Sequence, residues 1–195
     1  MSNHVETIIE VDIHNRNRAT VFGRLILIVP IGVFLSSMTE TSLWGAASGF
    51  LFLPALLALV FRGVYPSYVL NFNHALLELQ TRISVYAFFL TDEYPSIERN
   101  PRVAVLLPDV EGGRRLNRWM PLVKWFLALP LYLVGFAYSL AAGVVTVIAW
   151  FVVLFTGRYP EWAVEIVLGT IKFWNRVYGY MLLLVTDEYP SFSFK

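Results

Sequence analysis

The longest stretch of the chain without a charged residue, from Trp125 to Gly157, limits its fold more than any other feature. A helix that crosses a bilayer needs roughly 20 mainly apolar residues. This stretch is too long for one such helix unless the helix is strongly tilted, and it is a little short for two. Extended back to Trp119, it has room for a tight helical hairpin with its turn near Ser139–Gly143. We therefore expect two membrane spans here, at residues 119–138 and 141–157.

Two apolar segments in the first half of the chain also have the length of a span. Residues 21–38 are interrupted only by Arg24, and residues 41–61 contain no charge. Arg24, like Lys124 in the second half, lies near the start of its span, from which a long side chain can reach the headgroups. The chain is 57% hydrophobic and 15% charged, against about 45–50% and about 25% in soluble domains. These features predict an all-α membrane protein with four transmembrane helices.

The distribution of basic residues predicts the orientation of these spans. Arginines precede the first span and crowd the central loop, whereas the connection from Ser36 to Ser42 contains neither lysine nor arginine. Loops rich in lysine and arginine remain on the cytoplasmic side. We therefore expect both termini and the central loop to be cytoplasmic.

The segments 66–90 and 160–185 have helical periodicity but carry charged residues within the apolar pattern. In the first, apolar residues recur at helical spacing from Val69 onwards, and Glu78 and Arg82 lie on the other side. Such a helix fits two positions, across the membrane or along its surface. If both segments crossed, the arginine-rich central loop would lie outside, so we favour amphipathic interfacial helices on the cytoplasmic side.

An internal repeat relates the two halves of the chain. The hexapeptide Thr-Asp-Glu-Tyr-Pro-Ser occurs at residues 91–96 and again at residues 186–191. Upstream of it, Tyr65 and Tyr159 are each followed by proline. A looser match aligns the segment that begins at Arg24 with the one that begins at Lys124, because each basic residue lies six positions before a proline.

The repeat predicts two tandem units, residues 1–99 and 100–195. Each unit contains a short β-prone segment, two spans, an interfacial helix and the Thr-Asp-Glu-Tyr-Pro motif. The β-prone segments, near residues 8–13 and 102–107, could pair in a small cytoplasmic sheet. An even number of crossings gives both units one orientation, so their pseudo-two-fold axis is expected along the membrane normal.

The second unit resembles a known bacterial family, domain-of-unknown-function family 4389. The resemblance rests on Arg176 and Tyr180 followed by the motif at residues 186–190, with Lys124 and Pro130 opening the unit. It extends to the first unit, which departs from the pattern with Ile97 where Phe192 stands and Gly32 where Tyr132 stands. The resemblance implies the cytoplasmic (inner) membrane of a bacterium and supports two tandem copies. It implies no catalytic residue.

The acidic pairs of the motif, Asp92 with Glu93 and Asp187 with Glu188, are the main candidate site. Two such clusters could bind a cation or transfer protons. The alternative is a structural turn, since proline ends a helix and Asp and Thr bond the local backbone. An acid at a helix C-terminus opposes the helix dipole, so a basic partner is expected. We favour the structural interpretation, with Arg82 and Arg176 as partners.

The second set of candidates consists of basic residues that could contact lipid headgroups or a protein partner. Lys172 and Arg176 lie one helical turn apart, where like charges repel unless an anion lies between them. A phospholipid headgroup would serve, although simple extension towards water explains the spacing equally well. The full set comprises Arg82, Arg114, Arg115, Arg118, Lys172 and Arg176.

Other kinds of chemistry lack their usual signatures in this sequence. There is no cysteine, the three histidines show no metal-ligand spacing, and the net charge of +1 gives no basic face for nucleic acid. We expect no enzyme activity, no cofactor and no metal. The favoured function is an accessory, assembly or scaffolding subunit that contacts membrane lipids and a protein partner or further copies of itself. The alternative is a lipid or small-solute binder or transporter with a cavity between the units.

Overall fold

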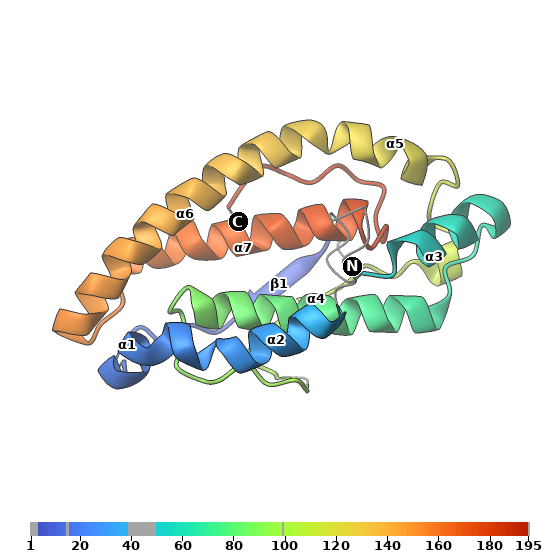
Figure 1. Ribbon diagram of the computed structural model, residues 1–195. Helices are drawn as coiled ribbons and strands as arrows, with labels where there is room; N and C mark the ends of the chain where they lie inside the picture. The colour runs from blue at the N-terminus through green and yellow to red at the C-terminus, as the bar shows by residue number, and fades with distance from the viewer. Residues whose placement is uncertain (1–3, 15, 39–49, 99, 195) are drawn as a thin grey trace.

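The structure is a computed structural model that describes residues 4–14, 16–38, 50–98 and 100–194. It is predominantly helical, with one small sheet (Figure 1). The strands are β1 (Glu6–Ile9) and β2 (Val103–Leu106). The helices are α1 (Arg18–Leu27), α2 (Val29–Met38), α3 (Phe52–Leu57), which continues as a π-helical turn (Ala58–Arg62), α4 (Ser67–Ala87), α5 (Met120–Leu127), α6 (Leu129–Thr156) and α7 (Glu161–Met181), with a 3-10 turn at Glu111–Gly113.

The β-prone regions pair, since β1 and β2 form an antiparallel sheet with Thr7 opposite Val105. The first strand begins and ends earlier than the expected segment, residues 8–13, and shares only residues 8 and 9 with it. Each strand is held by the long helix of the other half of the chain. Asn175 of α7 donates a hydrogen bond to the Thr7 hydroxyl (3.1 Å), and His74 Nε2 of α4 lies 2.5 Å from the Val105 carbonyl oxygen. The sheet therefore lies across the middle of α4 and α7.

Helices α4 and α7 form the interior of the molecule, although we expected both at a membrane surface. They contact each other where Thr81 and Asn175 exchange hydrogen bonds of 3.2 and 3.0 Å. Val69 and Val85 of α4 are fully buried, and so is Val177 of α7. The apolar stripe read from the sequence therefore packs against neighbouring helices of the same chain.

The helical hairpin expected around Ser139–Gly143 is not formed, because α6 runs through these residues without interruption. The prediction of separate spans at 119–138 and 141–157 is therefore wrong. Residues 131–156 contain no proline, so no missing backbone N–H interrupts the helix there. The chain bends earlier, at Ala128, because Pro130 has no backbone N–H to offer the preceding turn.

The first half of the chain bends in the same way, between α1 and α2 just before Pro30. Of the second expected span, 41–61, the part up to residue 49 lies outside the described residues. The remainder forms α3 and its π-helical turn, which ends at Gly63 in the left-handed conformation (φ 62°).

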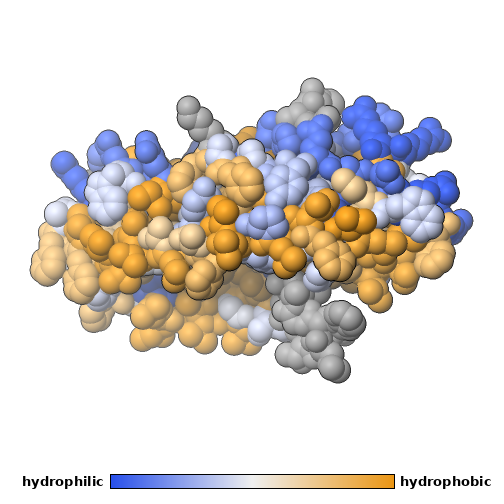
Figure 2. Space-filling view, turned by 90° about the horizontal axis from the view of Figure 1, so that it is seen from above, coloured by the Kyte–Doolittle hydropathy of each residue, from blue (hydrophilic) through white to orange (hydrophobic). Residues whose placement is uncertain are grey.

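Two described helical segments are long and apolar enough to cross a membrane, Arg18–Met38 and Leu129–Thr156. Both leave a large apolar surface uncovered. In α6, Leu133, Phe136 and Leu140 are exposed while Leu131 and Ala142 are buried. Figure 2 shows the result for the whole molecule: hydrophobic residues cover one broad side, and hydrophilic residues gather along the opposite side.

Candidate functional site

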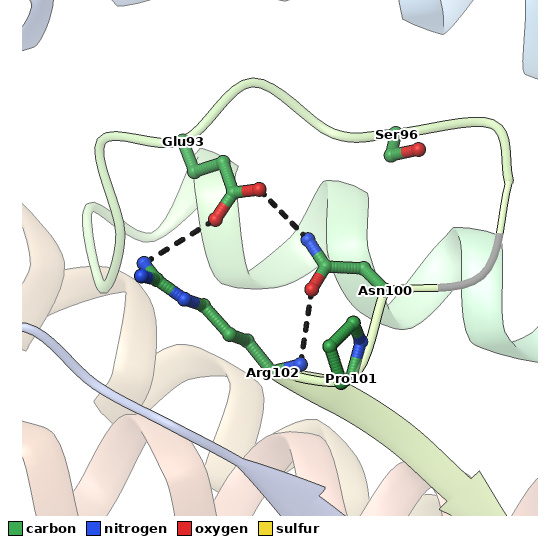
Figure 3. A pocket seen from close by; sticks show the side chains of 5 residues that line it. All are labelled: Glu93, Ser96, Asn100, Pro101 and Arg102. Atoms are coloured by element: carbon green, nitrogen blue, oxygen red, sulfur yellow. Dashed lines mark hydrogen bonds and ion pairs between the residues drawn. The ribbon is translucent and has the colours of Figure 1, made fainter.

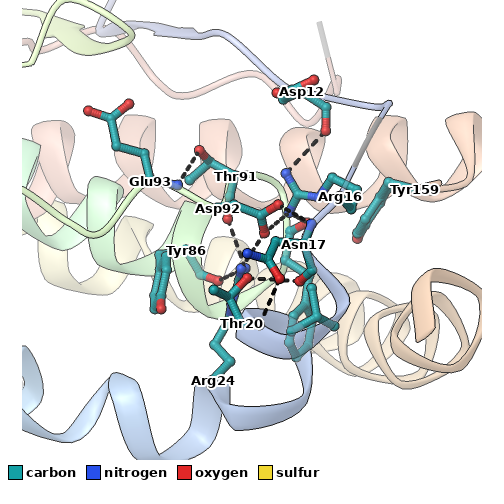
Figure 4. A network of polar contacts seen from close by, with 12 residues as sticks. Asp12, Arg16, Asn17, Thr20, Arg24, Tyr86, Thr91, Asp92, Glu93 and Tyr159 are labelled. Carbon is teal, nitrogen blue, oxygen red and sulfur yellow. Dashed lines mark hydrogen bonds and ion pairs between the residues drawn. The ribbon is translucent and has the colours of Figure 1, made fainter. Parts of the chain in front are cut away.

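A buried arginine fastens the first Thr-Asp-Glu-Tyr-Pro motif to the start of the chain. Arg24 of α1 has a side chain only 1% exposed, and its Nη2 lies 2.6 Å from Asp92 Oδ1. Its Nη1 donates to the carbonyl oxygens of Thr91 (2.8 Å) and Tyr86 (2.9 Å). Its guanidinium also lies over the Tyr86 ring, 4.2 Å from the centroid. We call this group of residues the Arg24 clamp (Figure 4).

The same carboxylate caps a helix. Asn17 precedes α1, and its side chain accepts hydrogen bonds from the backbone N–H groups of Ala19 and Thr20. The Asn17 backbone N–H donates to Asp92 Oδ2 (2.8 Å). Free N–H groups and the helix dipole both favour an anion at a helix N-terminus. One oxygen of Asp92 therefore neutralises a buried cation, and the other accepts a hydrogen bond at the start of α1.

A second arginine joins the Arg24 clamp. Arg16 donates through Nη2 to the Phe89 carbonyl oxygen, and the same nitrogen lies 3.3 Å from Asp92 Oδ1. Burial lowers the pKa of Arg16, and the charge of Asp92 opposes this shift. Asp92 thus lies within reach of two cations, of which Arg16 is also stabilised by the charge of Asp12.

The contacts around Arg24 recur around Lys124 in the second half. Lys124 of α5 is fully buried, and its Nζ lies 2.8 Å from Asp187 Oδ1 and 2.7 Å from the Thr186 carbonyl oxygen. The Asn117 backbone N–H donates to Asp187 Oδ2 (2.6 Å). The Lys124 ammonium also lies over the Tyr180 ring, 5.0 Å from its centroid. We call this second group the Lys124 clamp.

These contacts correct an expectation about the basic residues. Arg24 and Lys124 do not reach to the surface, because each has a carboxylate and a backbone carbonyl group within reach inside the protein. Arg82 and Arg176 each donate to a backbone carbonyl group that follows the nearby motif. Arg82 donates to the Ser96 carbonyl oxygen (2.9 Å) and lies near Glu78 (3.9 Å), while Arg176 donates to the carbonyl oxygen of Ser193.

The glutamates of the motif lie at the surface and hold neighbouring segments. Glu93 accepts a hydrogen bond from Asn100 (2.9 Å) and lies 3.4 Å from Arg102, which closes the loop between them (Figure 3). An open hollow of about 650 Å³ is lined by this loop. Glu188 lies 3.0 Å from His4 Nε2, near the start of the described chain.

A reciprocal pair of tyrosines joins the two halves. Tyr65 donates a hydrogen bond to the Leu183 carbonyl oxygen (2.5 Å), and Tyr159 donates one to the Phe88 carbonyl oxygen (3.1 Å). The residue after each acceptor has a positive φ, 58° and 62° respectively, although neither is a glycine. Burial raises the pKa of both tyrosines to about 12.

The remaining basic candidates are not gathered into one site. Arg114, Arg115 and Arg118 are exposed in the loop before α5, and Arg115 lies 2.5 Å from Glu111. Lys172 is half-buried in the middle of α7. Arg82 is only 4% exposed, so it is closed to lipid headgroups in this structure.

Sequence reasoning missed Arg16, both asparagines and the tyrosine pair. The sequence did carry a signal for the asparagines. Asn17 and Asn117 are each followed by arginine, and the spacing from Asn17 to Arg24 equals the spacing from Asn117 to Lys124. The acceptors of the tyrosines are backbone carbonyl groups, which leave no trace in a sequence. Among the residues that the structure describes, no three His, Asp or Glu side chains converge as a metal site would require.

Fold and clamps together define a mainly helical protein with two helices of membrane-spanning length and two motif carboxylates bound to buried cations. Residues 118–193 match the family model described as a domain of unknown function, DUF4389. This match supports the resemblance seen in the sequence and covers one copy, within the second half of the chain. No curated protein and no solved structure matched the chain.

Proposed function

We propose that the protein is a non-enzymatic subunit of the bacterial cytoplasmic membrane, with an accessory, assembly or scaffolding role in a membrane complex. The observation that carries this proposal is the use of both motif aspartates. Asp92 and Asp187, the main candidate groups of the sequence, each neutralise a buried cation and accept a hydrogen bond from the backbone N–H of an asparagine that precedes a helix. A carboxylate fixed in this way stabilises a framework and is poorly placed to exchange protons or ligands.

The proposal includes two tandem copies of the family's unit, residues 1–99 and 100–195. The two clamps support it, because equivalent residues make equivalent contacts in each half. The reciprocal tyrosines support it as well. Thr81 and Asn175, which occupy matching positions in α4 and α7, meet each other as residues beside a two-fold axis would.

The alternative function is a lipid or small-solute binder or transporter, which needs a cavity between the two copies. The point where α4 meets α7 is filled by Thr81 and Asn175, which are 2% and 4% exposed. The space that this alternative needs is therefore occupied by protein, and we rank it second.

Membrane lipids and either a protein partner or further copies of the chain are the proposed partners. In this proposal both termini and the central loop face the cytoplasm. The exposed Arg114 and Arg115 of that loop offer a contact for an acidic partner.

The test is a native pull-down after mild detergent extraction, followed by mass spectrometry of proteins and lipids. We expect a protein partner in a fixed stoichiometric ratio. The double variant Arg114→Glu/Arg115→Glu should lose the partner, and Glu161→Gln, which changes a charge at the start of α7, should retain it. A clean monomer that carries only lipid would contradict the scaffold and favour the binder.

A further inference from the structure

The small sheet prevents α4 and α7 from standing upright in a membrane. It lies across the middle of both helices, held there by the His74 and Asn175 contacts. Glu6, Glu10 and Arg102 are exposed on or beside its strands. If α4 and α7 crossed a bilayer, these charges and the open edges of the strands would lie at hydrocarbon depth, which is unfavourable.

Helix α6 runs beside α7 in the opposite direction and at an angle to it (Figure 1). Gly135 of α6 lies against Trp174 of α7, and the Thr170 hydroxyl reaches the Tyr138 carbonyl oxygen further along (3.5 Å). If α7 lies parallel to the membrane surface, this packing keeps α6 close to the same surface.

The exposure of α6 agrees with a helix in contact with lipid along one side only. Its exposed apolar residues recur at helical spacing along its whole length: Leu129, Leu133, Phe136, Leu140, Val144, Val147, Phe151 and Phe155. At 1.5 Å per residue the helix is roughly 42 Å long, against a hydrocarbon core of about 30 Å. Exposed apolar residues are also found in α1, α3 and α5, and Figure 2 shows hydrophobic residues over one broad side of the molecule. We call this surface the apolar face.

Arginine lies at both ends of the apolar face, and an exposed tryptophan lies at one of them. At one end, Arg18 lies against Gly157 at the C-terminus of α6, next to Arg158. At the other end, Arg118 lies against Gly63 and is followed by the exposed Trp119. Arginine attracts anionic headgroups and tryptophan prefers the headgroup level, so both ends suit the same membrane surface.

We propose that the apolar face is embedded in a single leaflet that contains anionic lipid, with the helices parallel to the membrane plane. The sheet then lies in the water that borders this leaflet. The protein is then monotopic and enters the bilayer without crossing it. This inference rests on the membrane location in the proposed function and is independent of any protein partner. It replaces the membrane-crossing helices that the sequence predicted.

The test uses single-cysteine variants, which need no background removal because the chain contains no cysteine. The purified chain is placed in vesicles of equal parts phosphatidylglycerol and phosphatidylcholine, and spin labels are attached at Leu133→Cys, Val144→Cys and Phe155→Cys. Collision with oxygen and with a water-soluble nickel chelate then measures the depth of each label. We expect similar depths, within a few ångströms, and a label at Arg102→Cys in water as the control.

Labelling with a membrane-impermeant thiol reagent separates the competing topologies. Monotopic insertion predicts that Arg118→Cys and Arg158→Cys react from one side only, and that Leu140→Cys reacts from neither. Reaction of Leu140→Cys from the far side would overturn the proposal in favour of a crossing hairpin. Reaction of the two arginine positions from opposite sides would overturn it in favour of one crossing helix.

A second copy of the chain over the apolar face would also overturn the proposal. The spin labels on α6 would then lose contact with oxygen and show dipolar coupling to labels on the other copy. A second copy would itself be a partner of the kind proposed above, so that outcome overturns the monotopic arrangement and supports the scaffold role. The other outcomes do not bear on the stoichiometric partner of the pull-down, so the two proposals fail or stand separately.

Discussion

Arg24 and Lys124 are buried cations whose partners still touch water. The side chains of Asp92 and Asp187 are 25% and 23% exposed, so each carboxylate keeps part of its hydration while it neutralises a charge that has lost its own. Removal of one member of a buried pair is costly because it leaves the other charge without a partner. Single substitutions in the clamps should therefore destabilise this protein more than substitutions elsewhere.

Asp92→Asn tests this at the Arg24 clamp. The variant keeps the shape of the side chain but removes the counter-charge of Arg24 and the nearer of the two carboxylates that act on Arg16. We expect a loss of about 3 kcal/mol in the free energy of unfolding, measured by denaturation in detergent. Glu93→Gln is the matched control, because the exposed Glu93–Arg102 pair should contribute at most about 1 kcal/mol. Equal effects of the two variants would contradict a structural role for the clamp.

The tyrosine pair predicts a loss of stability in alkali. Burial raises the pKa of Tyr65 and Tyr159 from 10.0 to about 12, so the folded protein favours the neutral hydroxyl more strongly than the unfolded chain does. Their contribution is complete below pH 10 and is lost as the pH rises towards 12. Tyr65→Phe should cost about 1 kcal/mol at neutral pH and weaken this pH dependence, as followed by thermal unfolding between pH 8 and 12. An unchanged slope would show that the Tyr65 hydroxyl is already ionised or exposed.

At the scale of elements, Gly179 allows the N-terminal segment to approach α7. A Cβ at this position would overlap the Val5 side chain. Gly179→Ala should destabilise the protein by about 1–3 kcal/mol and increase hydrogen exchange in β1 and its neighbours. The control is Gly143→Ala in α6, where the space is open and alanine should stabilise the helix by about 0.5–1 kcal/mol. Equal exchange in β1 for both variants would contradict this packing.

The positions of α4, α7 and the strands were predictable because local signals mark them. Pro66 and Pro160 immediately precede the two long helices, and β-branched residues mark the strands. The continuity of α6 was not predictable from hydropathy, which measures apolar length and cannot distinguish one long helix from a hairpin. The clamps join residues 68 and 63 positions apart, and several basic residues compete for each carboxylate in the sequence. Only the fold selects the pair.

At the scale of the whole molecule, the arginines at the ends of the apolar face should control its affinity for anionic membranes. A basic residue near the surface contributes about 1 kcal/mol, so Arg18→Gln and Arg118→Gln should each weaken binding to phosphatidylglycerol vesicles roughly fivefold. Vesicle flotation measures the effect, which should diminish as salt is added. Arg102→Gln, on the sheet side, should leave binding unchanged, and an equal loss there would mean that another surface meets the membrane.

The exchange of contacts between halves has a consequence for shorter chains. In each half, the strand packs on the helix of the other half and the tyrosine bonds to a carbonyl group of the other half. In a chain with a single copy, the strand and the tyrosine would lack these partners. Such a chain should gain them by self-association. Covalent fusion of two copies makes that association intramolecular and independent of concentration. On the proposal of two tandem copies, the chain corresponds to a dimer whose two subunits are permanently tethered.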